Sequence, residues 1–210
     1  SPNLATMLAV LASYVEASPV QLQASLGAGV PDSFNTLDVD GCTSTNDTVL
    51  LLASGLAGPV PDAALTAAVA EACASLAAQM AGDAEGATKV VRFRVTGAHD
   101  DAEALIGARA VARSQLVKCS WYGRDPYWGR IASDLGASGI GFDPELLSIC
   151  YGGIKVCAGG TTIDHDTEAV AAHMAERHLD IVAVVDRKTV VSGKRVLGRV
   201  DLGGRRNIRK

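Results

Sequence analysis

Aromatic residues are scarce in this chain of 210 residues, at 4% of the total, although 48% of the residues are hydrophobic. Alanine and small aliphatic side chains must therefore fill most of the core. Internal repeats and low-complexity tracts are also lacking. The length suits one large domain or two small ones, and we expect one compact unit followed by a loose tail.

The cysteines lack the spacing of a metal site or of a disulfide framework. They are Cys42, Cys73, Cys119, Cys150 and Cys157. An odd number without a Cys-x-x-Cys pair predicts free thiols in a reducing compartment and no zinc site. His173 and His178 are five residues apart, so on a helix they would point in different directions and would not share a metal.

Targeting and membrane-spanning segments are not expected either. The uncharged run Ser1–Val15 has no basic segment before it, as a signal peptide would have. The run Thr48–Pro61 is too short to span a bilayer and contains two glycines and two prolines. The sequence predicts a soluble, cytoplasmic protein that does not bind membranes.

The net charge of −4 is unevenly distributed. Residues 187–210 contain nine Lys and Arg against one acid, Asp201, whereas the other residues contain ten bases and twenty-two acids. A basic tail can bind nucleic acid, but this one has no aromatic residue for stacking on bases. A solvated terminal segment and no nucleic-acid partner are therefore expected.

Apolar periodicity and capping residues predict alternating strands and helices. Strands are expected at Met7–Val15, Leu37–Val39, Val90–Thr96 and Leu179–Val185, the last being the final strand, with a hairpin of Leu146–Cys150 and Ile154–Ala158. Helices are expected from Pro19 to about Leu26, at Asp62–Met80 and Asp100–Leu116, from the turn at 125–130 to about Gly136, and at Thr167–His178. This order indicates an α/β or α+β fold with mixed sheets.

Residues 40–48 are all small or polar, and the apolar run Val49–Leu52 follows them directly. Such a segment can be a hydrophilic loop built on Asx and hydroxyl turns. It can equally form the wall of a site, because polar groups that enter a core need internal hydrogen bonds. The sequence leaves both interpretations open.

Ala5-Thr6 precedes the apolar run Met7–Leu11. By itself this dipeptide fits the start of a buried strand. It also fits a self-cleaving enzyme, in which the Thr6 hydroxyl attacks the Ala5 carbonyl and the resulting ester hydrolyses. The freed amine of Thr6, with a reference pKa of about 7.7–8.0, could then act as the base for its own hydroxyl.

Four segments in order resemble the bifunctional ornithine acetyltransferase family, also called glutamate N-acetyltransferase. They are Pro2–Leu8, Asp38–Leu52, Asp83–Lys89, and Leu116–Lys118 together with Asp125–Arg130. Their order and spacing are similar to the C-terminal half of that family. The resemblance covers about residues 2–185, so residues 1–185 are expected to form a β-chain-like catalytic region and 186–210 a basic tail that departs from the family.

The resemblance implies a layered αββα fold and cleavage between Ala5 and Thr6. Thr6 would take an acetyl group from N-acetylornithine and pass it to glutamate by a ping-pong reaction in arginine biosynthesis. Glu85 would contact the substrate amine, which suits a carboxylate. The family uses no metal and no organic cofactor. Its α and β pieces stay together, which implies an upstream α chain as partner in an α2β2 heterotetramer.

This sequence departs from the family in three ways. The oxyanion donors and a substrate-binding lysine lie upstream of it, and Tyr127 replaces an asparagine beside Trp128. The tail lacks the family's terminal pattern. Two alternatives therefore stand beside the transferase: a relative acting on another amide or acyl substrate, such as an antibiotic-pathway acetyltransferase or amidase, and an inactive, uncleaved fragment.

Overall fold

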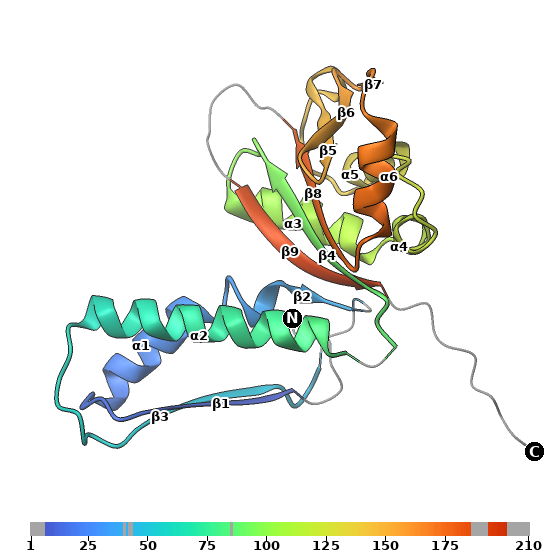
Figure 1. The fold of residues 1–210 in the computed structure, drawn as a ribbon. Helices are drawn as coiled ribbons and strands as arrows, with labels where there is room; N and C mark the ends of the chain where they lie inside the picture. Colours follow the sequence, from blue (N-terminus) through green and yellow to red (C-terminus); the bar gives the residue numbers. More distant parts are fainter. Residues whose placement is uncertain (1–6, 40, 42–43, 85, 186–192, 201–210) are drawn as a thin grey trace, which may run out of the picture. The chain divides into compact units, whose positions relative to one another are not determined.

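The computed structural model describes residues 7–39, 41, 44–84 and 86–185, and the backbone of 193–200. The chain divides into two units, Ser1–Asp83 and Ala84–Lys210, rather than the single compact unit expected from composition. Each unit has its own strands and helices (Figure 1). The proposed division at residue 185 follows the family resemblance and stays a prediction.

The first unit is built on two parallel strands, β1 (Leu8–Ser13) and β3 (Thr48–Ala53), which pair from Leu8 opposite Thr48 to Ser13 opposite Ala53. Helices α1 (Pro19–Gly29) and α2 (Asp62–Gly82) pack on each other and on the strands. A one-turn 3-10 helix and the short strand β2 (Leu37–Asp38) lie between α1 and β3 in sequence.

Helix α1 begins where the sequence predicted. Ser18 accepts a hydrogen bond from the Gln21 backbone N–H, and the Gln21 side chain accepts one from the Ser18 N–H, so the two residues form a capping box. The expected stop near Leu26 is wrong, because the helix continues to Gly29. A side chain at Gly29 would begin 3.2 Å from the Ala70 Cα of α2, so this glycine allows the two helices to approach closely.

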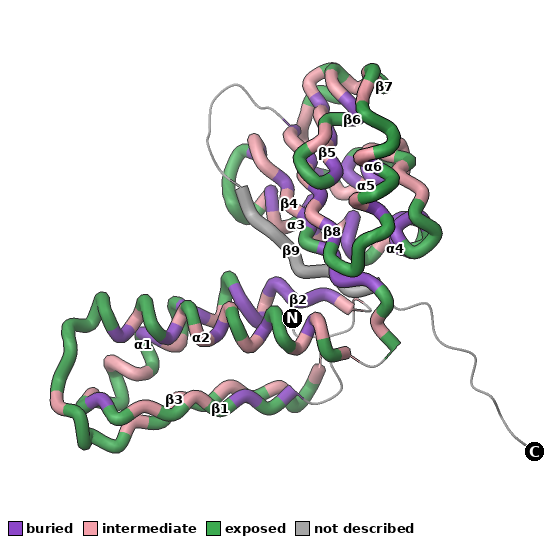
Figure 2. The backbone as a smooth tube through the Cα atoms, viewed as in Figure 1, coloured by how far each residue is buried: buried purple, intermediate pink, exposed green. Residues whose placement is uncertain are grey.

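Among the described residues, none covers one face of the β1–β3 pair. Leu8, Val10, Leu50 and Leu52 are 71%, 57%, 47% and 54% exposed. The alternate residues Ala9, Leu11, Val49 and Leu51 are buried or half-buried towards the helices, and Figure 2 shows this alternation along both strands. We call Leu8, Val10, Leu50 and Leu52 the open apolar face. A contiguous exposed apolar cluster is uncommon on the surface of a monomeric protein.

The second unit contains a mixed sheet with the strand order β9-β4-β8-β5-β6-β7. The strands are β4 (Lys89–Thr96), β5 (Ser148–Tyr151), β6 (Ile154–Ala158), β7 (Thr161–Thr162), β8 (His178–Val184) and β9 (Gly193–Val200). The helices are α3 (Asp101–Arg113), α4 (Gln115–Tyr122), α5 (Gly129–Ala137) and α6 (Thr167–Ala175). Strands β4 and β8 run parallel, and the remaining pairs are antiparallel.

The core of this unit lies on one face of β4. Val91, Phe93 and Val95 are fully buried, whereas Arg92 and Arg94 lie on the other face, as the alternation predicted. The Phe93 ring packs against Trp121 of α4 with ring centroids 6.2 Å apart. Two of the few aromatic side chains therefore meet in a core that is otherwise mostly aliphatic.

The single helix predicted at Asp100–Leu116 is wrong, because it is broken into α3 and α4. Ser114 has an extended conformation, and its side chain accepts a hydrogen bond from the Val117 N–H, so it caps a second helix. The helix predicted at Thr167–His178 is also too long. It ends at Ala175, and His178 already belongs to β8.

Strand β8 was predicted to be the last strand, but β9 follows it and pairs antiparallel with β4 from Gly193 opposite Thr96 to Val200 opposite Lys89. Part of the segment predicted as a loose tail is therefore a strand. The reason is non-local: β4 offers its backbone groups on the side away from β8, and β9 satisfies them.

The Lys89 side chain connects the start of β4 to the end of α6 by hydrogen bonds. Its side chain is buried and donates hydrogen bonds to the carbonyl oxygens of Met174, at 2.8 Å, and of Glu176. Burial and the nearby Arg124 lower the pKa of the Lys89 ammonium, whereas the Glu176 carboxylate raises it. The ammonium thus donates hydrogen bonds to backbone carbonyls that have no partner within the helix where α6 ends.

We expect Lys89→Met to lower the free energy of unfolding by about 2 kcal/mol, because hydrogen bonds to a charged group contribute about 1.5–3 kcal/mol. Urea denaturation followed by circular dichroism measures this change. Lys155→Met is the control, since Lys155 is exposed on β6. Equal unfolding midpoints for the two variants would show that Lys89 does not support α6.

Candidate functional site

The three predicted site residues, Ala5, Thr6 and Glu85, lie outside the described residues. Their roles in cleavage, catalysis and substrate binding stay predictions. The structure does describe Met7, the residue bonded to the carbonyl carbon of Thr6, and several of its contacts.

Met7 is held on both sides of its backbone. Its N–H donates to the Asp47 carboxylate oxygen Oδ1 at 2.7 Å, and its carbonyl oxygen accepts from the Thr48 N–H at 2.9 Å. Its side chain is only 3% exposed. The backbone immediately after the candidate nucleophile is therefore clamped where the β1–β3 ladder begins.

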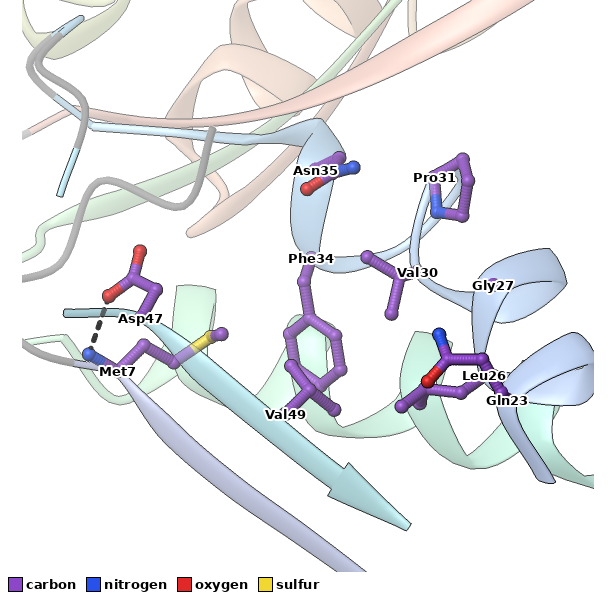
Figure 3. Close-up of a pocket in the computed structure, with 10 residues that line it drawn as sticks. All are labelled: Met7, Gln23, Leu26, Gly27, Val30, Pro31, Phe34, Asn35, Asp47 and Val49. Atoms are coloured by element: carbon purple, nitrogen blue, oxygen red, sulfur yellow. Dashed lines mark hydrogen bonds between the residues drawn. The ribbon is translucent and has the colours of Figure 1, made fainter. Parts of the chain in front are cut away.

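A hollow of about 450 Å³ lies beside this clamp in the first unit. Figure 3 shows the side chains that surround it. They come from the end of α1, the segment after it, Met7 and the start of β3. The lining residues are Met7, Gln23, Leu26, Gly27, Val30, Pro31, Phe34, Asn35, Asp47 and Val49. The hollow is mostly apolar and has a few polar groups, the general character of a small-molecule site.

The described residues of the polar segment, 41 and 44–48, include both loop contacts and one residue that lines the hollow. Part of it is loop scaffolding, since the Ser44 hydroxyl accepts from the Asn46 N–H and the Thr48 hydroxyl donates to the Asn46 carbonyl. Asp47, in contrast, points back to Met7 and lines the hollow. Its second carboxylate oxygen, Oδ2, is buried and has no hydrogen-bond partner among the described residues.

Sequence reasoning did not single out Asp47. The available signal was its position, one residue before a strand that runs parallel to the strand following Thr6. Recognising that signal requires the register of β1 on β3, which places Leu8 opposite Thr48. The printed sequence does not reveal such a pairing.

The turn at 125–130 has several internal contacts, and Tyr127 takes part in two of them. The Asp125 carboxylate accepts from the Tyr127 N–H at 3.1 Å and lies 3.5 Å from the Arg130 guanidinium. The Tyr127 ring lies over Gly129, where a Cβ atom would come within 2.6 Å of it. Trp128 donates its indole N–H to the Thr162 hydroxyl. In the second unit this motif serves to start α5.

Within the described ranges, no group of three or more His, Cys, Asp or Glu side chains is arranged to hold a metal ion. Cys73, Cys119, Cys150 and Cys157 are free thiols. Burial raises the pKa of the Cys73, Cys150 and Cys157 thiols. A raised pKa lowers the thiolate fraction of these three side chains and so their reactivity.

Helix α2 is long and apolar enough to cross a membrane when judged by length and composition alone. Its buried residues follow a four-residue spacing on one side of the helix: Leu65, Val69, Cys73, Ala77 and Ala81. This stripe is typical of a helix that packs one face against the rest of a domain, and 22% of its most apolar window is buried. Its contacts with α1 and β1 agree with a soluble protein.

Comparison with known proteins gives a consistent result. The profile of the ArgJ family matches residues 1–197. The arginine biosynthesis bifunctional protein ArgJ of Thermobifida fusca is 44% identical over 165 residues, which are 78% of this chain and 43% of that protein. ArgJ of Bifidobacterium longum is 45% identical over 185 residues, which are 86% of this chain and 47% of that protein.

A crystal structure of ArgJ from Bacillus halodurans superimposes with a TM-score of 0.86 at 34% identity. The match covers 94% of this chain and 95% of the solved chain. The predicted layered α/β fold is thereby confirmed. The chain spans about half the length of the curated relatives that it matches. Sequence profile, relatives and fold agree, and the chain belongs to the ArgJ family.

Proposed function

We propose that this chain is the nucleophile-bearing half of an ornithine acetyltransferase that moves an acetyl group from N-acetylornithine to glutamate. The reaction serves arginine biosynthesis in the cytoplasm and uses neither a metal nor an organic cofactor. The observation that carries the proposal is the family match over residues 1–197, which includes Thr6 and Glu85. The clamped backbone of Met7 adds support, because a nucleophile must be held rigidly.

Cleavage before Thr6 comes first in this proposal. The Thr6 hydroxyl oxygen adds to the Ala5 carbonyl carbon, the Ala5–Thr6 amide bond breaks, and the hydroxyl proton passes to the departing nitrogen. Water then hydrolyses the ester, which restores the hydroxyl and releases Ala5 as a carboxylate. The lengths of the relatives support this step. The match covers only 43–47% of the curated ArgJ proteins, whereas it covers 95% of the ArgJ chain in the crystal structure, so that solved chain is about half as long as a curated ArgJ protein.

Acetyl transfer uses the same hydroxyl. Thr6 attacks the acetyl carbonyl carbon of N-acetylornithine while its α-amine accepts the hydroxyl proton and delivers it to the leaving ornithine nitrogen. The product is an acetyl ester on Thr6. The amine of glutamate then attacks that ester, and the proton it loses returns to the Thr6 oxygen, which leaves N-acetylglutamate and free enzyme.

The partner in this proposal is the upstream α half of the same precursor, assembled as α2β2. The family resemblance assigns the oxyanion donors to that half. The open apolar face supports the pairing, because four exposed leucine and valine side chains on two adjacent strands are costly to leave in water.

Glu85→Gln is expected to lower kcat/KM for N-acetylornithine by about 10- to 100-fold while cleavage at Ala5–Thr6 continues. A carboxylate that pairs with the substrate ammonium contributes a charge-assisted hydrogen bond of about 1.5–3 kcal/mol, and the neutral amide retains only part of it. Steady-state kinetics together with the intact mass measure both effects. Asp83→Asn, two residues away, is the control. A kcat/KM equal to that of the wild type would remove Glu85 from the site.

The decisive experiment is the intact mass of the chain expressed with its natural upstream half. A β chain that begins at Thr6 and gains one acetyl group with N-acetylornithine is the expected result. Transfer of that group to glutamate distinguishes this function from hydrolysis by an amidase-like relative. A mass that retains residues 1–5 would contradict the proposal and indicate an inactive fragment.

A further inference from the structure

Strand β1 has an outer edge with which no described strand pairs. At one end of its parallel ladder with β3, the Met7 carbonyl oxygen accepts from the Thr48 N–H. At the other end, the Ser13 carbonyl oxygen accepts from the Ser54 N–H. Alternate residues of a strand use the backbone groups on one side, so those of the intervening residues point away from β3. These outer-edge residues are Leu8, Val10 and Ala12.

A second hollow of the first unit, of about 460 Å³, runs along this edge. Four successive residues of β1, 10–13, line it. Successive side chains of a strand point to opposite faces, so a hollow on one face would touch only alternate residues. The hollow therefore follows the edge of the strand. Its opposite wall is α2, which contributes Leu65, Ala68, Val69, Ala72, Ser75 and Leu76.

The helix layer of this unit is wider than its strand layer. Helix α1 contacts β3, and α2 contacts both α1 and β1. Packed helices lie about 8–10 Å apart and paired strands about 4.7–4.9 Å apart, so two helices span the width of about four strands. Among the described residues this sheet has only two strands (Figure 1). Helix α2 thus leaves room for a further strand beside β1.

We propose that an extended segment of the upstream half adds a strand to the outer edge of β1 and inserts side chains between β1 and α2. The inference rests on the proposed function, because the upstream half is the partner named there. The matches cover only 43–47% of the curated ArgJ proteins, so more than half of such a protein lies outside the matched part and can supply the segment. A two-stranded sheet is marginal by itself, and an added strand stabilises it.

The surroundings of the edge define the chemistry of this segment. On one face its side chains would meet α2, where Ala68 and Ala72 leave room for branched aliphatic groups. On the other face they would extend the open apolar face beside Leu8 and Val10. A charged side chain would lose its hydration on either face. The segment is therefore an apolar run of about five or six residues, bound by main-chain hydrogen bonds.

Two proline variants test the hydrogen bonds in the complex of residues 6–210 co-expressed with a tagged upstream half. Ala12→Pro removes an N–H from the outer edge of β1. Ala53→Pro is the matched control, because Ala53 lies opposite Ser13 and its N–H points to the other edge of the pair, away from β1. Neither variant breaks the β1–β3 ladder. Ala12→Pro is expected to weaken association at least about tenfold and Ala53→Pro less than about threefold, measured by light scattering on dilution.

A second pair of variants tests the hollow. Ala68→Glu places a carboxylate in its wall, whereas Ala67→Glu places one on an exposed part of α2 outside it. Ala68→Glu is expected to weaken association at least about 100-fold and Ala67→Glu to leave it unchanged, because only the first buries an unpaired charge. Circular dichroism checks that both variants fold.

Hydrogen exchange of the wild-type complex tests the edge without any substitution. The amides of Leu8, Val10 and Ala12 should exchange as slowly as those of Ala9 and Leu11, which belong to the β1–β3 ladder. Rapid exchange of the three outer-edge amides would overturn the inference.

The inference is also overturned if the two proline variants, or the two glutamate variants, weaken association equally. If Ala12→Pro instead separates two copies of this chain while each keeps its upstream half, a second copy occupies the edge and the inference is wrong. In all these cases, a wild-type complex that begins at Thr6 and transfers acetyl to glutamate leaves the proposed function standing. Wild-type halves that do not associate would overturn both.

Discussion

A precursor carrying Thr6→Ala is expected to remain in one piece and to lose acetyl transfer by at least about 10³-fold, because removing the nucleophile of a covalent mechanism removes every step that depends on it. Intact mass over time measures cleavage, and N-acetylglutamate production measures transfer. No other nucleophile is assigned to this reaction, and the buried thiols of Cys73 and Cys157 have raised pKa values.

Thr6→Ser is the matched control for this variant, because it keeps the hydroxyl and removes only a methyl group. It is expected to cleave and to form an acetyl ester, more slowly than wild type, since the β-branched methyl restricts the rotamer of the hydroxyl. Folding is checked by comparing the circular dichroism of both variants. Cleavage of Thr6→Ala at the wild-type position would show that another group performs the reaction.

Leu50→Asp is expected to weaken association with the upstream half by at least about 100-fold. Leu50 lies in the middle of β3 on the open apolar face, between Leu8, Val10 and Leu52. A carboxylate buried there without a partner costs several kcal/mol, whereas in the free chain it stays in water at little cost. Assembly should therefore fail while the fold of the chain remains.

Co-expression of residues 6–210 with a tagged upstream half, followed by affinity purification and light scattering, measures this association. Leu116→Asp is the control, because Leu116 is 68% exposed on α4 in the second unit. Wild type and control should elute as a complex that contains both halves. An intact complex with Leu50→Asp would show that the open apolar face is not where the upstream half binds.

Local signals in the sequence correctly predicted several elements of the fold. Ser18-Pro19 marked the start of α1, Asp166 capped α6, and Gly152-Gly153 formed the turn between β5 and β6. Each of these depends on residues a few positions apart, so the chain itself contains the whole interaction. The break at Ser114 was missed, although its hydroxyl is a capping group, because the apolar period continues across it.

Long-range pairing was not predictable in this way. Strand β9 contains three basic residues and two glycines, which make a poor strand pattern, yet its backbone completes the sheet beside β4. The contact between Asp47 and Met7 joins residues 40 positions apart. Neither the β4–β9 pairing nor the Asp47–Met7 contact could be deduced from local secondary-structure propensity. Both depend on which strands pair and in what register.

The sequence by itself determined the family of this protein and its class of fold, since these depend on residue types in a fixed order, and Thr6 as the nucleophile stays a prediction from the same sequence. The tertiary structure alone decided that the backbone after Thr6 is held by Asp47 and Thr48, and that one face of the β1–β3 pair is left open. The physical reason is that hydrogen bonding and burial depend on distances in space, and folding brings together groups that lie far apart along the chain.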